Sequence, residues 1–189
     1  MLNNEINYIV SGIERSGTSL MMQVLHKSGL PVAFDDSRAD DEHNPRGYYE
    51  LEGGKIINRL MDGTFDLQSW RGHIIKVTAY GLKFLPKTNY KILYMMRNID
   101  EVLKSMQKMG ADIDEVKDRM LLSKLNRFSF RLMRSRHDME HIRVNYSDLV
   151  DSPRREMERV SRFFGETFDV DTAIKAVEPS LYRNRAPSG

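Results

Sequence analysis

The sequence contains no cysteine, and this absence removes several classes of site at once. Without thiols the chain can form neither a disulfide framework nor a thiolate zinc site, and it has no cysteine nucleophile. A chain without cysteine fits a reducing compartment, so we expect a cytoplasmic protein. Long apolar runs are also missing, and the first ten residues resemble neither a signal peptide nor an anchor. The sequence therefore predicts no membrane span.

A strong excess of one charge is missing as well. The 29 lysines and arginines nearly balance 27 aspartates and glutamates, which leaves a net charge of +2. So small an excess does not indicate nucleic acid, and we expect no such partner. The acidic and histidine residues show no metal-ligand spacing, so we also expect no metal site. A length of 189 residues, of which 40% are hydrophobic, favours one domain spanning 1–189.

Short β-rich runs alternate with longer helical patterns along the chain, which is typical of a parallel α/β sheet. The expected strands are 6–10, 73–77, 90–96 and 141–145, and the expected helices are 17–28, 100–108, 113–136 and 153–164. The fold class that follows is a single α/β domain with a central parallel sheet flanked by helices. In the longest helix, an apolar stripe (Leu121, Leu125, Phe128, Leu132) runs beside a basic one (Lys124, Arg127, Arg131, Arg134).

The most informative segment is Ser11–Ser19, SGIERSGTS, which joins the first strand to the first helix. Gly12 and Gly17 permit a tight turn in which backbone N–H groups point to one centre, and the helix adds its positive N-terminal end. Arg15 contributes a permanent cation. Hydroxyl donors come from Ser16, Thr18 and Ser19. Together these groups predict an anion cradle of the P-loop nucleoside-phosphate-binding type.

This loop differs from that of an ATPase or kinase at one decisive position. The P-loop of those enzymes is G-x-x-x-x-G-K-[ST], and its lysine contacts the β- and γ-phosphates of ATP. Here Thr18 occupies the lysine position, and the cation stands two residues before the second glycine, at Arg15. The displaced cation favours an anionic group other than the end of ATP. A nucleotide kinase with a degenerate loop is the first alternative.

With its order of strand, R-S-G-T-S and helix, the sequence resembles the sulfotransferases that use 3′-phosphoadenosine 5′-phosphosulfate (PAPS). Their 5′-phosphosulfate loop commonly has the pattern G-x-x-[RK]-S-G-T-[ST], which Gly12–Ser19 matches, with Glu14 where bacterial members often have proline. A second match is Arg97 at the end of a strand with Ser105 eight residues later, as in the family's 3′-phosphate site. The segments 44–50 (NPRGYYE) and 144–150 (VNYSDLV) are also similar to the family.

The resemblance implies transfer of a sulfuryl group from PAPS to a hydroxyl or amine, without a metal, leaving adenosine 3′,5′-bisphosphate. It assigns the donor to the loop residues with Arg97 and Ser105. The chain lacks the tail motif of the hormone-conjugating branch, and Arg183 and Arg185 in LYRNR are candidates to replace it. The acceptor is a small molecule or a carbohydrate. The alternative outside catalysis is a nucleotide-binding protein of the same fold.

Three residues are the candidates for catalysis. Arg15 would neutralise charge on the leaving group, and Lys76, at the end of the second strand, would hold or protonate the bridging oxygen. The acceptor hydroxyl needs a base, and Glu50 is the first candidate because it closes NPRGYYE. Weaker candidates precede it in the polar loop: Asp41, Glu42 and His43.

Overall fold

The computed structural model describes residues 1–41, 44, 47–165, 168–177, 182 and 185. Its strands are β1 (Asn7–Gly12), β2 (Ile74–Lys76), β3 (Tyr90–Met96) and β4 (Met139–Asn145). Its α-helices are α1 (Thr18–Lys27), α2 (Ile56–Met61), α3 (Ile99–Lys108), α4 (Glu115–Ser135), α5 (Tyr146–Asp151), α6 (Pro153–Phe164) and α7 (Val170–Ala176). Short 3-10 turns are η1 (Glu52–Gly54), η2 (Leu67–Trp70) and η3 (Gly81–Phe84). The expected strands and helices all form, with small shifts at their ends.

The four strands form one parallel sheet in the order β2-β1-β3-β4. Residues 8–10 of β1 pair with 74–76 of β2, and β3 runs beside β1 along its whole length. Because all strands are parallel, their carboxyl ends meet at one edge, which is where ligands bind in open α/β sheets. The loop after Gly12, Lys76, Arg97 and Tyr146 all lie at this edge.

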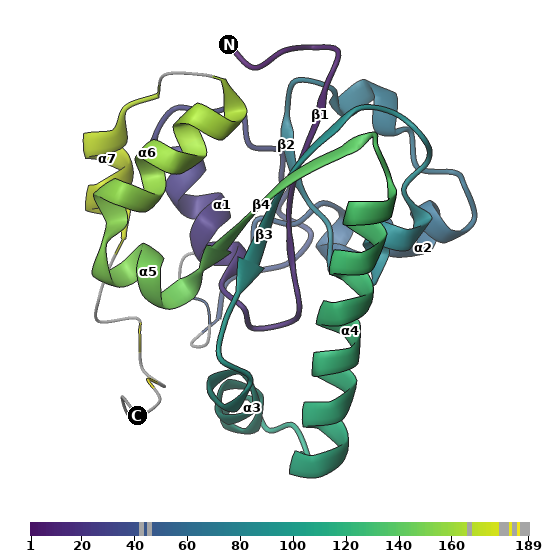
Figure 1. The fold of residues 1–189 in the computed structure, drawn as a ribbon, viewed down its shortest axis with the longest axis vertical. Coiled ribbons are helices and arrows are strands. Elements are labelled where there is room, and N and C mark those ends of the chain that lie inside the picture. The colour runs from purple at the N-terminus through teal and green to yellow at the C-terminus, as the bar shows by residue number, and fades with distance from the viewer. Residues whose placement is uncertain (42–43, 45–46, 166–167, 178–181, 183–184, 186–189) are drawn as a thin grey trace.

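Helices cover both faces of the sheet (Figure 1). On one face α1, α5, α6 and α7 enclose a core that includes Met21, Val144 and Met157. On the other, α2, η3 and α4 enclose a second core around Ile75, Ile92 and Met133. The expected α/β class with a central parallel sheet flanked by helices is therefore confirmed. None of the helices in the described ranges is long and apolar enough to cross a membrane.

The most buried side of helix α4 is not its most apolar stripe, of which only Leu125 and Leu132 pack against the core. Its buried residues are Asn126, Ser129 and Met133, whereas Leu121 and Phe128 on the apolar stripe are 48% and 44% exposed. Polar side chains are tolerated on the buried side because they find partners: Asn126 accepts a hydrogen bond from the Tyr94 hydroxyl at 2.8 Å. The basic stripe lies in solvent, with all four of its side chains exposed.

Candidate functional site

A pocket of about 550 Å³ opens at the carboxyl edge of the sheet. Its wall is formed by the loop after β1, the end of β2, the end of β3 with the second half of α3, and the segment before η1. Of the residues expected to bind the donor or to act on it, nine contribute to this wall: Gly12, Arg15, Gly17, Thr18, Ser19, Glu50, Lys76, Arg97 and Ser105. Residues up to 93 positions apart in the chain thus share one cavity, Gly12 and Ser105 being the extremes.

Gly17 fixes the approach of the loop to α5. Its φ of 100° lies in the left-handed region, and an added Cβ would stand 2.4 Å from the Tyr146 ring. Only glycine permits both the backbone angle and this contact. Gly17 also precedes α1 without a capping side chain, so the first N–H groups of the helix remain available to an anion in the pocket.

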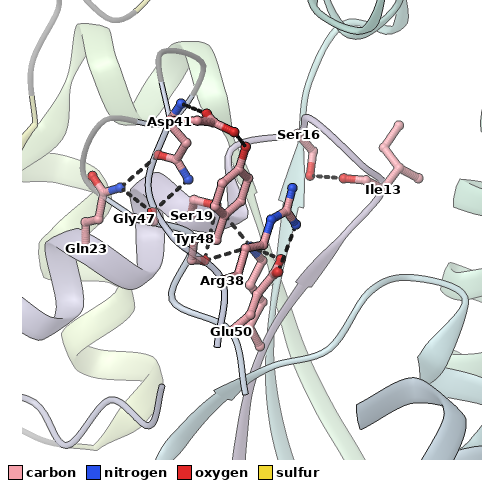
Figure 2. Close-up of polar contacts among 11 residues, drawn as sticks. Ile13, Ser16, Ser19, Gln23, Arg38, Asp41, Gly47, Tyr48 and Glu50 are labelled. Carbon is pink, nitrogen blue, oxygen red and sulfur yellow. Dashed lines mark hydrogen bonds and ion pairs between the residues drawn. The ribbon is translucent and has the colours of Figure 1, made fainter. Parts of the chain in front are cut away.

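Ser16 has a different place from the one expected. Its hydroxyl donates to the Ile13 carbonyl at 2.7 Å, its N–H donates to the same carbonyl at 3.2 Å, and its side chain is fully buried (Figure 2). Ser16 does not line the pocket. The hydroxyl that we expected to face the ligand is hydrogen-bonded to the Ile13 carbonyl instead, so the Ser16 side chain stabilises the turn. The neighbouring Glu14 is exposed at the pocket rim.

Arg15 links the loop to α3. Its Nε donates to the Ser105 hydroxyl at 3.0 Å, and Arg97 Nη1 donates to the Arg15 carbonyl at 3.2 Å. The backbone at Arg15 has a φ of 61°, a left-handed angle that few side chains adopt. The cation of the loop and the expected Arg97–Ser105 pair are thereby brought into direct contact, and two arginines face one cavity.

Arg97 is held by partners on three sides. Its Nε donates to Glu101 at 3.0 Å, and both side chains are buried. Its guanidinium lies 4.3 Å from the centre of the Tyr146 ring. Tyr182 donates from its hydroxyl to Glu101 at 2.8 Å, and burial followed by this bond raises the pKa of Tyr182 to about 12. The arginine is thus positioned before any ligand arrives.

Lys76 and Glu50 form an ion pair inside the pocket wall. Lys76 Nζ donates to Glu50 at 2.8 Å, to the Tyr48 carbonyl at 2.9 Å and to the Ser19 hydroxyl at 3.0 Å. The two side chains are only 8% and 12% exposed. Burial lowers the pKa of Lys76, and the carboxylate of Glu50 offsets part of that shift. The two expected catalytic residues thus bind one another.

Glu50 has a second cation on its other oxygen. Arg38 Nη1 donates to that oxygen at 3.0 Å, and its guanidinium lies 3.4 Å from the centre of the Tyr48 ring (Figure 2). Tyr48 in turn donates to Asp41 at 2.7 Å. Asp41, a weaker candidate base, is therefore engaged with Tyr48 and is absent from the pocket lining. Glu42 and His43 lie outside the described residues.

Comparison with known proteins agrees with this architecture. Residues 80–170 match the sulfotransferase family. The resemblance to that family is confirmed. The matched range includes Arg97 and Ser105 but not the loop, Glu50 or Lys76. The match therefore supports sulfuryl transfer as the general activity, and it does not test the role of any single residue. No curated protein matches the chain in sequence.

Solved structures show the same fold at low identity. The sulfotransferase domain of the olefin synthase from Synechococcus PCC 7002 is 16% identical, with a TM-score of 0.58 over 100% of this chain and 91% of that one. The sulfotransferase STF1 of Mycobacterium tuberculosis H37Rv is 15% identical, with a TM-score of 0.56 over 93% and 71%. A retinol dehydratase in complex with androsterone and the inactive cofactor PAP is 14% identical, with a TM-score of 0.54 over 97% and 65%. Each of these similarities shows that the chain shares the fold of these proteins.

In this sulfotransferase-like chain, Arg185 does not take the expected place. Arg185 pairs with Asp151 of α5, lies 4.5 Å from the Tyr182 ring and is absent from the pocket lining. Its charge is neutralised outside the pocket by Asp151. Arg183 lies outside the described residues. Tyr182, in the same segment, is connected to the site through Glu101.

Sequence reasoning missed Arg38, Tyr48, Glu101 and Tyr182. Glu101 had a local signal, because it stands four residues after Arg97 on a helix, the spacing of an ion pair. Tyr182 depends on a contact across the 81 positions to Glu101, which no local pattern indicates. Arg38 and Tyr48 contact Glu50, Asp41 and each other within 12 positions, but in an irregular loop whose path has no regular spacing to predict it.

Proposed function

We propose that the chain is an enzyme that transfers a sulfuryl group from PAPS to a hydroxyl or amine, leaving adenosine 3′,5′-bisphosphate. The observation that supports this best is the contact between Arg15 and Ser105 at 3.0 Å. It joins the expected 5′-phosphosulfate loop to the expected 3′-phosphate pair in a single pocket. A donor with anionic groups at both ends of its ribose fits two arginines better than a simple nucleoside diphosphate does.

The reaction is an in-line displacement at sulfur. The acceptor oxygen or nitrogen forms a bond to sulfur while the bond from sulfur to the phosphate oxygen breaks, and its electron pair stays on the leaving phosphate. Arg15 and the open N–H groups at the start of α1 face that growing charge. Fixed donors of this kind stabilise the transition state because they need no reorganisation.

Lys76 and Glu50 divide the proton transfer between them. Glu50 accepts the proton of the acceptor on the oxygen that Lys76 releases, while Arg38 stays on the other oxygen. Lys76, freed by that step, holds the bridging oxygen of the leaving phosphate. Burial lowers the pKa of Lys76, which makes its proton easier to donate than that of an exposed lysine.

The partners proposed for this chemistry are few. A solved protein of this fold holds androsterone and the inactive cofactor PAP, which supports a nucleotide and a small molecule as ligands. The acceptor here is a small molecule or a carbohydrate, the protein acts in the cytoplasm, and neither a metal nor a nucleic acid takes part. We therefore expect the activity to survive EDTA. An absolute need for Mg²⁺ would instead favour the alternative function, a nucleotide kinase with a degenerate P-loop.

Calorimetry of nucleotide binding tests the donor site. We expect adenosine 3′,5′-bisphosphate to bind about tenfold more tightly than ADP, since the 3′-phosphate gains a charge-assisted contact. Ser105→Ala should reduce that preference, whereas Ser123→Ala, on α4 and outside the pocket lining, should leave it intact. Equal affinities for the two nucleotides in the wild type would refute the 3′-phosphate assignment.

A further inference from the structure

One part of the pocket wall is mainly apolar, although Thr78 and Lys108 also line the pocket beside it. It consists of Val77, Ala79 and Tyr80 after β2, Met109 after α3 and Leu125 of α4. The Ser129 hydroxyl donates to the Ala79 carbonyl at 3.4 Å, so α4 lies directly against the segment after β2. This part of the wall is therefore continuous across two elements, and it is distinct from the arginines and the loop that suit the donor.

The apolar surface continues from the pocket onto the outside of the molecule. Leu121 and Phe128 flank Leu125 on one side of α4 at helical spacing and are 48% and 44% exposed. Tyr80, itself 45% exposed, packs edge-on against Phe84 with ring centres 5.5 Å apart. We call the surface formed by Tyr80, Phe84, Leu121, Leu125 and Phe128 the apolar shelf. Phe84 and Leu125 also pack against the core, and Lys83 lies over the Tyr80 and Phe84 rings, but Tyr80, Leu121 and Phe128 are more exposed than core packing requires.

The shelf begins close to the residues proposed for proton transfer. Tyr80 follows Lys76 by four residues, and the intervening Val77 and Ala79 extend along β1 through hydrogen bonds to Val10 and Gly12, at 3.0 and 2.9 Å. Lys76, Tyr80 and Leu125 line the same pocket. A molecule resting on the shelf would thus reach Lys76 and Glu50 with one end.

We propose that the apolar shelf binds the body of the sulfuryl acceptor, and that the acceptor is an alcohol or phenol with a hydrocarbon body. A saccharide is a poor fit, because the leucine and phenylalanine side chains of the shelf offer no partner to its hydroxyls, Tyr80 offers a single hydroxyl, and leaving the other groups unpaired is costly. An apolar body loses no such bonds and gains from leaving water. The proposal rests on the proposed function, since it names the acceptor of that same site.

Binding of 2-naphthol to the full chain saturated with adenosine 3′,5′-bisphosphate tests the proposal, with methyl α-glucoside as the polar comparison. We expect 2-naphthol to bind and the glucoside not to bind. Leu125→Ser should weaken naphthol about tenfold, the effect of roughly two buried methylene groups. Leu132→Ser is the matched control, because Leu132 is the same residue type on the same helix, also half-buried, and outside the pocket lining. Its naphthol affinity should stay within about twofold of the wild type.

Phe128→Ser provides a second variant at an exposed position, where folding is not at risk, and Val116→Ser, 81% exposed on the same helix, is its control. Equal naphthol affinity in Leu125→Ser, Phe128→Ser and the wild type would overturn the proposal, as would tighter binding of the glucoside. A loss of nucleotide affinity in Leu125→Ser would also overturn it, by assigning the shelf to the donor. Naphthol binding without any binding of adenosine 3′,5′-bisphosphate or turnover of PAPS would instead refute the proposed function.

Discussion

A buried ion pair dominates the site at the scale of single residues. Lys76 and Glu50 are almost withdrawn from water, and each charge is tolerated because the other is 2.8 Å away. Removing one partner of such a pair is costly, because it leaves a buried charge unpaired, whereas replacing both partners is much less so. Stability and catalysis are therefore coupled at Glu50, and an experiment must separate them.

Glu50→Gln makes that separation. The substitution keeps the shape and one oxygen for Lys76 but removes the negative charge and the ability to take a proton. We expect turnover of PAPS with an acceptor to fall by about 10²–10⁴ and the free energy of unfolding to fall by about 2 kcal/mol. Steady-state kinetics and urea denaturation measure the two effects.

Two further variants complete this prediction. Glu52→Gln is the control, because Glu52 pairs with the half-exposed Arg59 and does not line the pocket, so both quantities should stay near wild type. Glu50→Gln combined with Lys76→Met should recover much of the lost stability and none of the turnover. A Glu50→Gln protein that is less stable yet keeps wild-type turnover would show that Glu50 is only the partner of Lys76.

At the scale of elements, α1 has a left-handed glycine at each end, and the two differ in their surroundings. Gly17 before the helix has a φ of 100°, and a Cβ added to it would lie 2.4 Å from the Tyr146 ring. Gly29 after the helix has a φ of 85° and nothing within 4 Å. The backbone angle alone should make alanine unfavourable by about 1–2 kcal/mol at either site.

The difference between the two alanine variants measures the contact with Tyr146. Gly29→Ala should lose about 1 kcal/mol of unfolding free energy. Gly17→Ala should lose at least about 2 kcal/mol more, because Arg97 and Tyr182 on the other sides of the ring prevent it from moving away. Urea denaturation of both proteins tests this. Equal losses would mean that the loop shifts freely and that its distance from α5 is not fixed.

The elements were largely predictable from the sequence because their signals are local. The strand 90–96 was expected with the bounds that β3 has, and Pro153 and Gly165 bracket α6 as helix signals predict. The orientation of α4 was not predictable in the same way. Its apolar stripe marks it as a helix, yet the side that faces the sheet is one with Asn126 and Ser129, whose partners come from β3 and the segment after β2.

The site was predictable only in part, for the same reason. The order of strand, R-S-G-T-S and helix indicates an anion-binding loop, and the pair of Arg97 and Ser105 was expected beside it. Ser16 shows the limit of such reasoning, since its residue type suits a ligand while its position suits the Ile13 carbonyl. The link between Lys76 and Glu50 depends on how the segment before η1 folds back over β2, which no short pattern specifies.

At the scale of the whole molecule, the far end of the chain is connected to the first loop. Tyr182 donates to Glu101, Glu101 accepts from Arg97, and Arg97 donates to the Arg15 carbonyl. The Tyr182 ring also packs edge-on against Tyr146, with centres 4.9 Å apart, and Tyr146 contacts Gly17. Both routes end on the anion-binding loop, so Tyr182 helps to set its geometry.

Tyr182→Phe tests this connection because it removes only the hydroxyl and keeps the ring. We expect a loss of about 1 kcal/mol in unfolding free energy and a fall of roughly three- to tenfold in affinity for adenosine 3′,5′-bisphosphate, since Glu101 without Tyr182 holds Arg97 more strongly. Tyr90→Phe is the control: it loses one hydroxyl bond, to the Pro86 carbonyl at 2.8 Å, away from the pocket. Its stability should fall by a similar amount while nucleotide affinity is unchanged. If calorimetry finds the same nucleotide affinity in both variants, Tyr182 stabilises the fold without positioning the arginine.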